Sequence, residues 1–164
     1  MMFDKGPIEG VVVTPSKKRV DKRGWLIELF RHDELAEEFH PEMGYVSLTN
    51  PGVLRGPHEH VDQADLFAWV GPGDFKVTLW DNRQRSLIYA NRMECFMGSR
   101  NPGSILVHKV VVHCYRCIST VPGLVPQPAL CRSGKKTPID EIRHEDNPEN
   151  IFVQDELIQR NFNR

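Results

Sequence analysis

The feature that most constrains the fold is a series of short apolar runs, each ended by a glycine or proline turn. The run that closes at Val70 is followed by "GPGD", and similar punctuation recurs as "RNPGS" at 100–104 and "TVPG" at 120–123. Short runs bounded by such residues are typical of strands, and no helical pattern alternates with them. Many short strands with close turns predict an all-β sandwich or barrel.

The positions of these glycine and proline turns predict the secondary-structure elements. Strands are expected at 8–15, 24–30, 45–50, 65–70, 75–81, 86–96, 104–119 and 123–130. One short helix is expected over 31–40, after a capping Asp33, and another near the polar C-terminal end. With 164 residues, the chain is long enough for one domain, 1–164, with a sizeable core.

The composition excludes several classes of partner. The formal net charge is −1, so no global basic field favours nucleic acid or an anionic membrane. No apolar run approaches the ~18–20 residues needed to span a bilayer, and the first ten residues lack the apolar core of a signal peptide. We therefore expect a cytoplasmic protein. The "CYRC" pair, Cys114 and Cys117, is expected to consist of buried, inert thiols, and the three tryptophans are expected in the core.

Ionisable residues in the run "VLRGPHEHVDQADLFAWV" need a reason to stand in a strand. His58 and His60 fall on one face of an extended chain, because strand side chains repeat every two residues. By the same two-residue repeat, Arg55 would lie on the opposite face from His58 and His60. The intervening "GP" can interrupt this alternation, so the face of Arg55 is not fixed by the sequence. Two histidines that point into a barrel are either neutral metal ligands or a general base with a polar neighbour.

The metal alternative has a definite pattern. His58, His60, Asp65 and a distant His113 have the ligand spacing of the cupin barrel, and mixed nitrogen and oxygen ligands suit iron, manganese, nickel or zinc. The segment "HKVVVHC" has His108 and Val110 where cupins place proline and glycine. Asp65 is also shorter than the glutamate that is common at its position.

Five segments together support the base alternative. They are "DKRGWLIELFR" at 21–31, "GVLRGPHEH" at 52–60, the stretch 62–86, "VVVHCYR" at 110–116 and "DEIRHEDNP" at 140–148. In this order they resemble the dTDP-4-dehydrorhamnose 3,5-epimerase family and cover most of the chain. The resemblance implies an all-β, cupin-type antiparallel jelly roll with short helices. It also implies a homodimer formed through an N-terminal strand.

The resemblance assigns roles to individual residues. His58 matches the base that removes a proton α to the C4 ketone of the sugar. Asp155 is the nearest candidate for the acid that orients this base. The residues expected to contact the substrate are Arg23, Glu28, Arg55, His60, Gln63, Asp65 and His113. The two arginines among them are expected on the diphosphate, which suits bidentate guanidinium geometry.

The implied activity is epimerisation of a nucleotide-diphosphate 4-keto-6-deoxy sugar at C3, C5 or both, in deoxysugar or cell-surface polysaccharide biosynthesis. A C4 ketone acidifies the neighbouring C–H bonds, so a neutral imidazole suffices and no cofactor is expected. Two departures stand out. Asp65 replaces a family lysine, and Cys131 stands where a family tyrosine is expected, with Tyr45, Tyr89 or Tyr115 as substitutes.

Two alternatives therefore stay open beside the epimerase. One is a metal-dependent cupin enzyme, a sugar isomerase or an oxygenase. The other is a cupin that binds a sugar nucleotide without catalysis.

Overall fold

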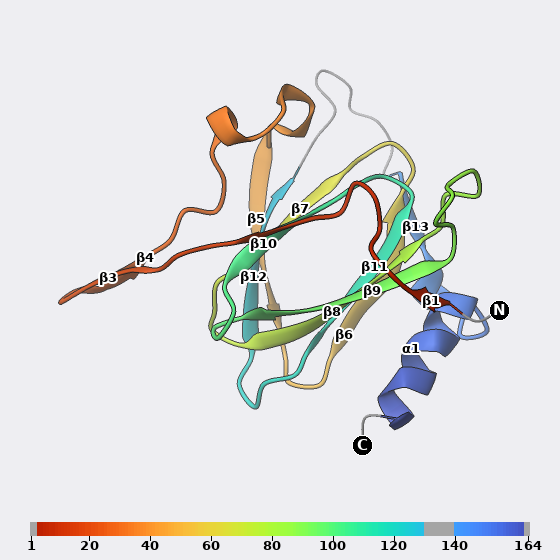
Figure 1. Cartoon of the computed structure of the whole chain (residues 1–164). Helices are drawn as coiled ribbons and strands as arrows, with labels where there is room; N and C mark the ends of the chain where they lie inside the picture. The colour runs from red at the N-terminus through yellow and green to blue at the C-terminus, as the bar shows by residue number, and fades with distance from the viewer. Residues whose placement is uncertain (1–2, 130–139, 163–164) are drawn as a thin grey trace.

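Two β-sheets face each other in the computed structural model, which describes residues 3–129 and 140–162 (Figure 1). The six-stranded sheet runs in the order β1 (Asp4–Lys5), β9 (Asn91–Gly98), β8 (Asp74–Asp81), β11 (Val111–Cys117), β6 (Leu54–His60) and β13 (Glu141–Arg143). The five-stranded sheet runs β2 (Val12–Pro15), β10 (Gly103–Val107), β7 (Asp65–Trp69), β12 (Gly123–Ala129) and β5 (Met43–Thr49). Apart from the parallel β1–β9 pair, neighbouring strands are antiparallel, as expected for a cupin-type jelly roll.

The main core lies between the two sheets. Phe67 and Trp69 from β7 meet Phe75 and Leu79 from β8, and all four are almost fully buried. The outer face of the six-stranded sheet is also covered, because the helix α1 (Ile151–Phe162) packs a second apolar cluster against it. Because both faces are covered, most residues of β8 and β11 are buried, including the polar Thr78 and His113.

Several expected elements differ from the observed ones. The helix expected over 31–40 is replaced by two 3₁₀ turns, η1 (His32–Glu34) and η2 (Glu37–Phe39). Leu35 and Ala36 between them adopt extended backbone angles, which interrupts any helix. The strand expected at 104–119 is split into β10 and β11 by a turn at 109–110, and the strand expected from 86 begins at Asn91. The helix expected near the C-terminus is confirmed as α1.

The N-terminal segment forms an arm that projects from the two sheets. In place of one strand at 24–30, β3 (Arg19–Asp21) and β4 (Gly24–Leu26) pair as a separate two-stranded ribbon (Figure 1). Trp25 on this arm is 48% exposed, so its expected place in the core is wrong. Trp69 and Trp80 are fully buried, as predicted.

The buried thiols agree with a further expectation. Cys114 and Cys117 are buried and free, and burial raises the pKa of the Cys114 thiol. In the described part of the chain, no helix combines the length and apolar character needed to cross a membrane.

A bulge in β6 decides which side chains of that strand face inward. Opposite β11, His58 pairs with His113 and Arg55 pairs with Tyr115, so β6 carries one extra residue across the same interval. Gly56 lies in this interval with a φ of +80°, and a Cβ added there would lie 2.7 Å from the carbonyl oxygen of His113. The bulge shifts the alternation by one residue, which allows Arg55 and His58 to line the same cavity.

Gly56 is therefore expected to be irreplaceable, and Gly52 provides a matched control. Gly52 has a similar φ of +76°, but a Cβ added there meets nothing within 4 Å. In urea unfolding, Gly52→Ala is expected to lower the free energy of unfolding by about 1 kcal/mol, the cost of placing a residue with a Cβ in the left-handed backbone conformation. Gly56→Ala adds the clash with the β11 backbone and is expected to cost about 3 kcal/mol or more. Equal losses would contradict the tight approach of β6 and β11.

Candidate active site

A cavity of about 700 Å³ opens between the two sheets and is lined by side chains from both. The six-stranded sheet contributes Arg55, His58 and His60, and the five-stranded sheet contributes Tyr45 and Asp65. Two other hollows, of about 830 and 510 Å³, lie beside η2 and beneath the arm. Neither contains the histidines of β6, so the cavity between the sheets is the candidate active site.

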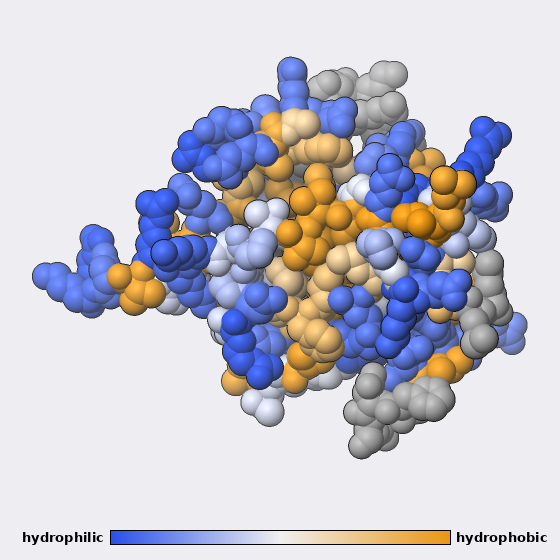
Figure 2. Space-filling model, viewed as in Figure 1, coloured by the Kyte–Doolittle hydropathy of each residue, from blue (hydrophilic) through white to orange (hydrophobic). Residues whose placement is uncertain are grey.

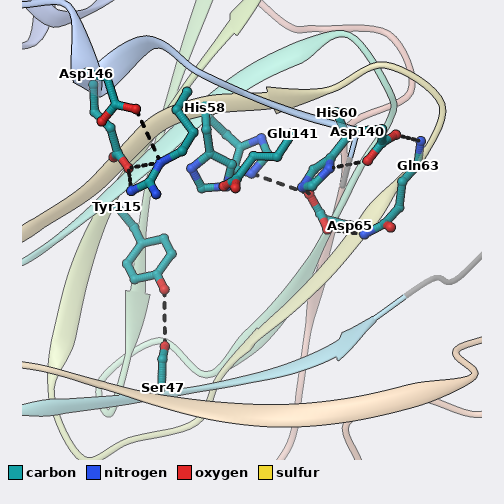
Figure 3. A network of polar contacts seen from close by, with 12 residues as sticks. Ser47, His58, His60, Gln63, Asp65, Tyr115, Asp140, Glu141 and Asp146 are labelled. Carbon is teal, nitrogen blue, oxygen red and sulfur yellow. Dashed lines mark hydrogen bonds and ion pairs between the residues drawn. The ribbon is translucent and has the colours of Figure 1, made fainter. Parts of the chain in front are cut away.

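His58 lies at the wall of this cavity with a side chain that is 15% exposed. Its ring packs against His113, with ring centroids 4.4 Å apart, and its Nε2 lies 4.0 Å from Oε1 of Glu141 (Figure 3). Burial, followed by repulsion from His113, lowers the pKa of His58 to about 3. The imidazole is therefore neutral at physiological pH and can accept a proton.

His60 is oriented by the carboxylate of Asp140, the residue that directly precedes β13. Its Nδ1 donates a hydrogen bond of 2.8 Å to Oδ1 of Asp140. The other oxygen of Asp140 accepts from the backbone N–H groups of Asp62 and Gln63, at 2.9 and 3.1 Å. Burial acts to raise the pKa of Asp140, but these hydrogen bonds outweigh it and hold the pKa below its usual value. Asp140 therefore stays ionised and fixes the ring of His60.

Asp65 and His113 lie next to His58 and His60 and complete a cluster of four titratable side chains. His113 is buried, and its Nδ1 donates to the carbonyl oxygen of Val111 at 3.0 Å. Burial lowers the pKa of His113 to about 4. Asp65 accepts a hydrogen bond of 3.3 Å from the side-chain amide of Gln63, and burial raises its pKa. Within residues 3–129 and 140–162, no group of three or more His, Cys, Asp and Glu side chains is arranged to hold a metal ion.

Four of the substrate-contact residues expected from the sequence lie together with His58. His60, Gln63 and Asp65 share the cavity with Arg55. The guanidinium of Arg55 is positioned by hydrogen bonds of 2.9 Å to Oγ1 of Thr49 and to the backbone carbonyl of Leu48. The fifth, His113, contacts the ring of His58 from beneath. A neutral base thus shares one cavity with a cation that can hold an anionic group.

Two of the expected contact residues lie elsewhere in this chain. Arg23 is on the projecting arm, with a side chain that is 83% exposed and bound to Asp21. Glu28 follows the arm and pairs with Arg19 at 3.5 Å and with Arg31 at 3.8 Å. Neither residue lines the cavity that contains the histidines of the same chain.

The expectation that Asp155 orients His58 is corrected. Asp155 lies on α1, where its Oδ2 accepts from Nε1 of Trp80 at 2.9 Å and pairs with Arg92 at 2.8 Å. Strand β8 places Leu79 opposite His113, so the adjacent Trp80 points to the other face of the sheet. Asp155 is therefore separated from the histidines by the sheet itself.

Sequence reasoning missed the two acids that take this place, Asp140 and Glu141. Both belong to the segment 140–148 that carried the family resemblance, but no role followed from their spacing. They reach the histidines only because β13 pairs with β6, with Glu141 opposite His60. That pairing joins residues about 80 positions apart and leaves no local signal.

Two tyrosines also line the cavity. The hydroxyl of Tyr115 lies 3.2 Å from Oγ of Ser47 (Figure 3), and burial raises its pKa. Burial also raises the pKa of Tyr45 to about 12, so both phenols stay protonated at neutral pH. Tyr89 does not line this cavity. Cys131, expected at a family tyrosine position, lies outside the described residues.

Comparisons with known proteins agree with this architecture. The sequence profile described as dTDP-4-dehydrorhamnose 3,5-epimerase matches residues 5–123. The spore coat polysaccharide biosynthesis protein SpsL of Bacillus subtilis (strain 168) is 36% identical over 116 residues, covering 70% of this chain and 75% of that protein. The probable low-salt glycan biosynthesis epimerase Agl13 of Haloferax volcanii is 33% identical over 119 residues, covering 72% and 76%.

A solved structure shares the fold at lower sequence identity. The crystal structure of a dTDP sugar isomerase from Desulfovibrio desulfuricans G20 superposes with a TM-score of 0.75 at 20% identity, over 88% of this chain and 90% of that one. The family profile spans well over half of the chain, and two curated relatives exceed 30% identity across more than two thirds of it. The chain therefore belongs to the dTDP-4-dehydrorhamnose 3,5-epimerase family of sugar-nucleotide epimerases, which have the cupin jelly-roll fold.

Proposed function

We propose that this protein epimerises a nucleotide-diphosphate 4-keto-6-deoxy sugar, at C3, at C5 or at both, with His58 as the general base. The observation that carries the proposal is a neutral imidazole in a cavity between the sheets. His58 is mostly buried, is held beside His113 and faces Glu141, and its lowered pKa leaves the nitrogen lone pair available. The family relatives named for polysaccharide and glycan biosynthesis support a role in making such glycans.

The chemistry needs a base, a place for the developing negative charge and a proton donor. A C4 ketone makes the adjacent C–H bond acidic, and His58 takes that proton while the electron pair moves toward the C4 oxygen. Glu141, 4.0 Å from His58 Nε2, lies where it stabilises the imidazolium that forms. Tyr45 and Tyr115 are protonated side chains of the same cavity that can return a proton to carbon.

The nucleotide end of the substrate is expected at Arg55. Its guanidinium lines the cavity and is held in place from β5, with Nε on Thr49 and an NH₂ group on the carbonyl of Leu48. A guanidinium held in this way can donate hydrogen bonds to phosphate oxygens. Binding of the diphosphate there would place the attached sugar ring beside the histidines. No cofactor is required for this reaction.

A homodimer would complete the site with the two residues that lie outside it. The arm exposes Val20 by 75% and Leu26 by 60%, and Figure 2 shows apolar surface on the projecting segment. Strand β5 is an edge strand of the five-stranded sheet and exposes Val46 and Leu48. An exposed apolar edge favours pairing with another chain. We propose that the arm of one copy packs along the other and brings Arg23 and Glu28 to its cavity.

Deuterium exchange tests the base directly. Incubation with a dTDP- or GDP-linked 4-keto-6-deoxy sugar in deuterated water, followed by proton NMR, is expected to show loss of the C3 proton signal. His58→Asn removes the base and is expected to abolish the exchange, whereas His32→Asn, on the exposed η1 turn, leaves it intact. Exchange that survives in His58→Asn would exclude His58 as the base. If the unmodified protein catalyses exchange with neither the dTDP-linked nor the GDP-linked sugar, the proposed activity is contradicted.

The pH dependence of this exchange follows from the state of His58. Because the pKa of His58 is lowered to about 3, the base stays neutral as the pH falls from 7 to 5, and kcat/KM is expected to be nearly constant over that range. A histidine with the ordinary pKa of about 6.5 would lose roughly 20-fold over the same range. A steep decline between pH 7 and 5 would show that the base is more exposed in solution than in the structure.

Mixing of inactive variants tests the contribution of the arm. Arg23→Ala and His58→Ala are each expected to be inactive, because each removes one half of every composite site. After subunit exchange in an equal mixture, half of the dimers are mixed and each has one intact site, so about a quarter of the original activity should return. Mixtures that stay inactive, from variants shown to exchange subunits, would contradict an arm that serves the partner.

A further inference from the structure

Three proton-accepting atoms converge beneath His58. Oδ2 of Asp65 lies 3.4 Å from Nε2 of His60 and 3.5 Å from Nε2 of His113. The side chains of Asp65 and His113 are only 9% and 3% exposed. Nε2 of His113 is a buried atom that has no hydrogen-bond partner among the described residues. An unpaired acceptor at so buried an atom as Nε2 of His113 is costly, so we expect the cluster to hold a proton.

The hydrogen bonds on the far sides of the two rings set their tautomers. Nδ1 of His113 faces the carbonyl of Val111, and Nδ1 of His60 faces the carboxylate of Asp140. Both partners can only accept, so both Nδ1 atoms carry hydrogen. When the rings are neutral, each Nε2 therefore presents a lone pair to Asp65. An ionised Asp65 would add a third acceptor to the same small space.

We propose that Asp65 is a neutral carboxylic acid whose proton is shared with His60 and His113, and that it donates this proton to the C4 oxygen as the enolate forms. Asp65 lines the same cavity as His58, so a sugar held there can reach both side chains (Figure 3). This inference rests on the proposed function for its role in catalysis. The protonation of Asp65 itself follows from the contacts alone.

The charged and titratable neighbours of Asp65 are compatible with this state. They are His58 and His60 on β6, His113 on β11, Tyr115 on β11, Tyr45 on β5 and Asp140 before β13. Burial raises the pKa of Asp65, while the nearby imidazoles act in the opposite direction. Burial also lowers the pKa of His113, which opposes an imidazolium at that ring. A neutral acid avoids placing an isolated charge in the dry cluster.

The proposed step conserves protons and electrons. His58 takes the proton from C3, the C–H pair forms the C3–C4 double bond, and the carbonyl pair moves to the C4 oxygen. The O–H of Asp65 donates its proton to that oxygen, so an enol and an Asp65 carboxylate form, and the imidazolium created at His58 balances the charge of this carboxylate. When C3 regains a proton, the C4 oxygen returns its own to Asp65. A donor aimed at a developing oxyanion contributes roughly 10²–10³-fold to the rate.

The protonation state can be measured without substrate. An infrared difference spectrum between the unmodified protein and Asp65→Asn at pH 7 is expected to contain a carboxylic-acid C=O band. Nitrogen-15 NMR should show Nδ1-protonated, neutral rings at His60 and His113. A carboxylate band with an imidazolium at His60, flanked by Asp140, would overturn the proposal. A stoichiometric metal ion bound to protein purified without chelator would overturn it as well.

Substitution then tests the catalytic role in the exchange assay. Asn keeps the shape of Asp65, its oxygen can accept from Gln63, and its amide has two hydrogens, one for a histidine Nε2 and one for the C4 oxygen. Asp65→Asn is expected to lose less than tenfold in kcat, whereas Asp65→Ala, without a donor, should lose roughly 10²-fold or more. The decline of rate at alkaline pH, where Asp65 ionises, should be present in the unmodified protein and absent in Asp65→Asn.

Outcomes of this comparison separate the two proposals. Equal losses in both variants, or an unchanged alkaline decline in Asp65→Asn, would remove Asp65 from catalysis. A carboxylic-acid band in a protein that exchanges no sugar proton would instead refute the epimerase function and leave the shared proton in place.

Discussion

The candidate site depends on the pairing of β6 with β11. This register places His58 opposite His113, and the bulge at Gly56 brings Arg55 to the face that the histidines share. A one-residue slip would turn every side chain of β6 to the other face. The pairing of β13 on the far edge of β6 then adds Glu141. The proposed base, the proposed anion-binding cation and the carboxylate beside them are thus positioned by one set of backbone hydrogen bonds.

Burial sets the electrostatics of this cluster. His58 and His113 are both held neutral because the cavity wall excludes water from an imidazolium. The same desolvation favours the neutral form of Asp65. A cluster of neutral groups that share one proton, as we propose, would suit enolate chemistry, in which charge moves between carbon, oxygen and nitrogen but the total charge stays constant. The fixed backbone partners limit the reorganisation that this transfer requires.

Much of the fold could be predicted from sequence because turn residues and strand periodicity are local. The two-residue repeat correctly placed His58 and His60 on one face, and the family segments identified the cupin jelly roll. The face of β6 on which Arg55 lies could not be predicted, because the bulge at Gly56 depends on contact with β11. Trp25 is exposed because β3 and β4 form a ribbon apart from the two sheets, which no local pattern reveals.

Residues far apart in the sequence were predicted least well. Asp155 was selected for its place near the C-terminus, but α1 packs on the outer face of the six-stranded sheet. The acids that reach the histidines instead, Asp140 and Glu141, do so through strand pairing over a long separation. A crystal structure with a bound dTDP-linked 6-deoxy sugar would test this geometry most directly. We expect the diphosphate at Arg55, the sugar C3 hydrogen over the imidazole of His58 and the C4 oxygen within hydrogen-bond distance of Asp65. A sugar ring bound outside the cavity, or a C4 oxygen directed away from Asp65, would contradict it.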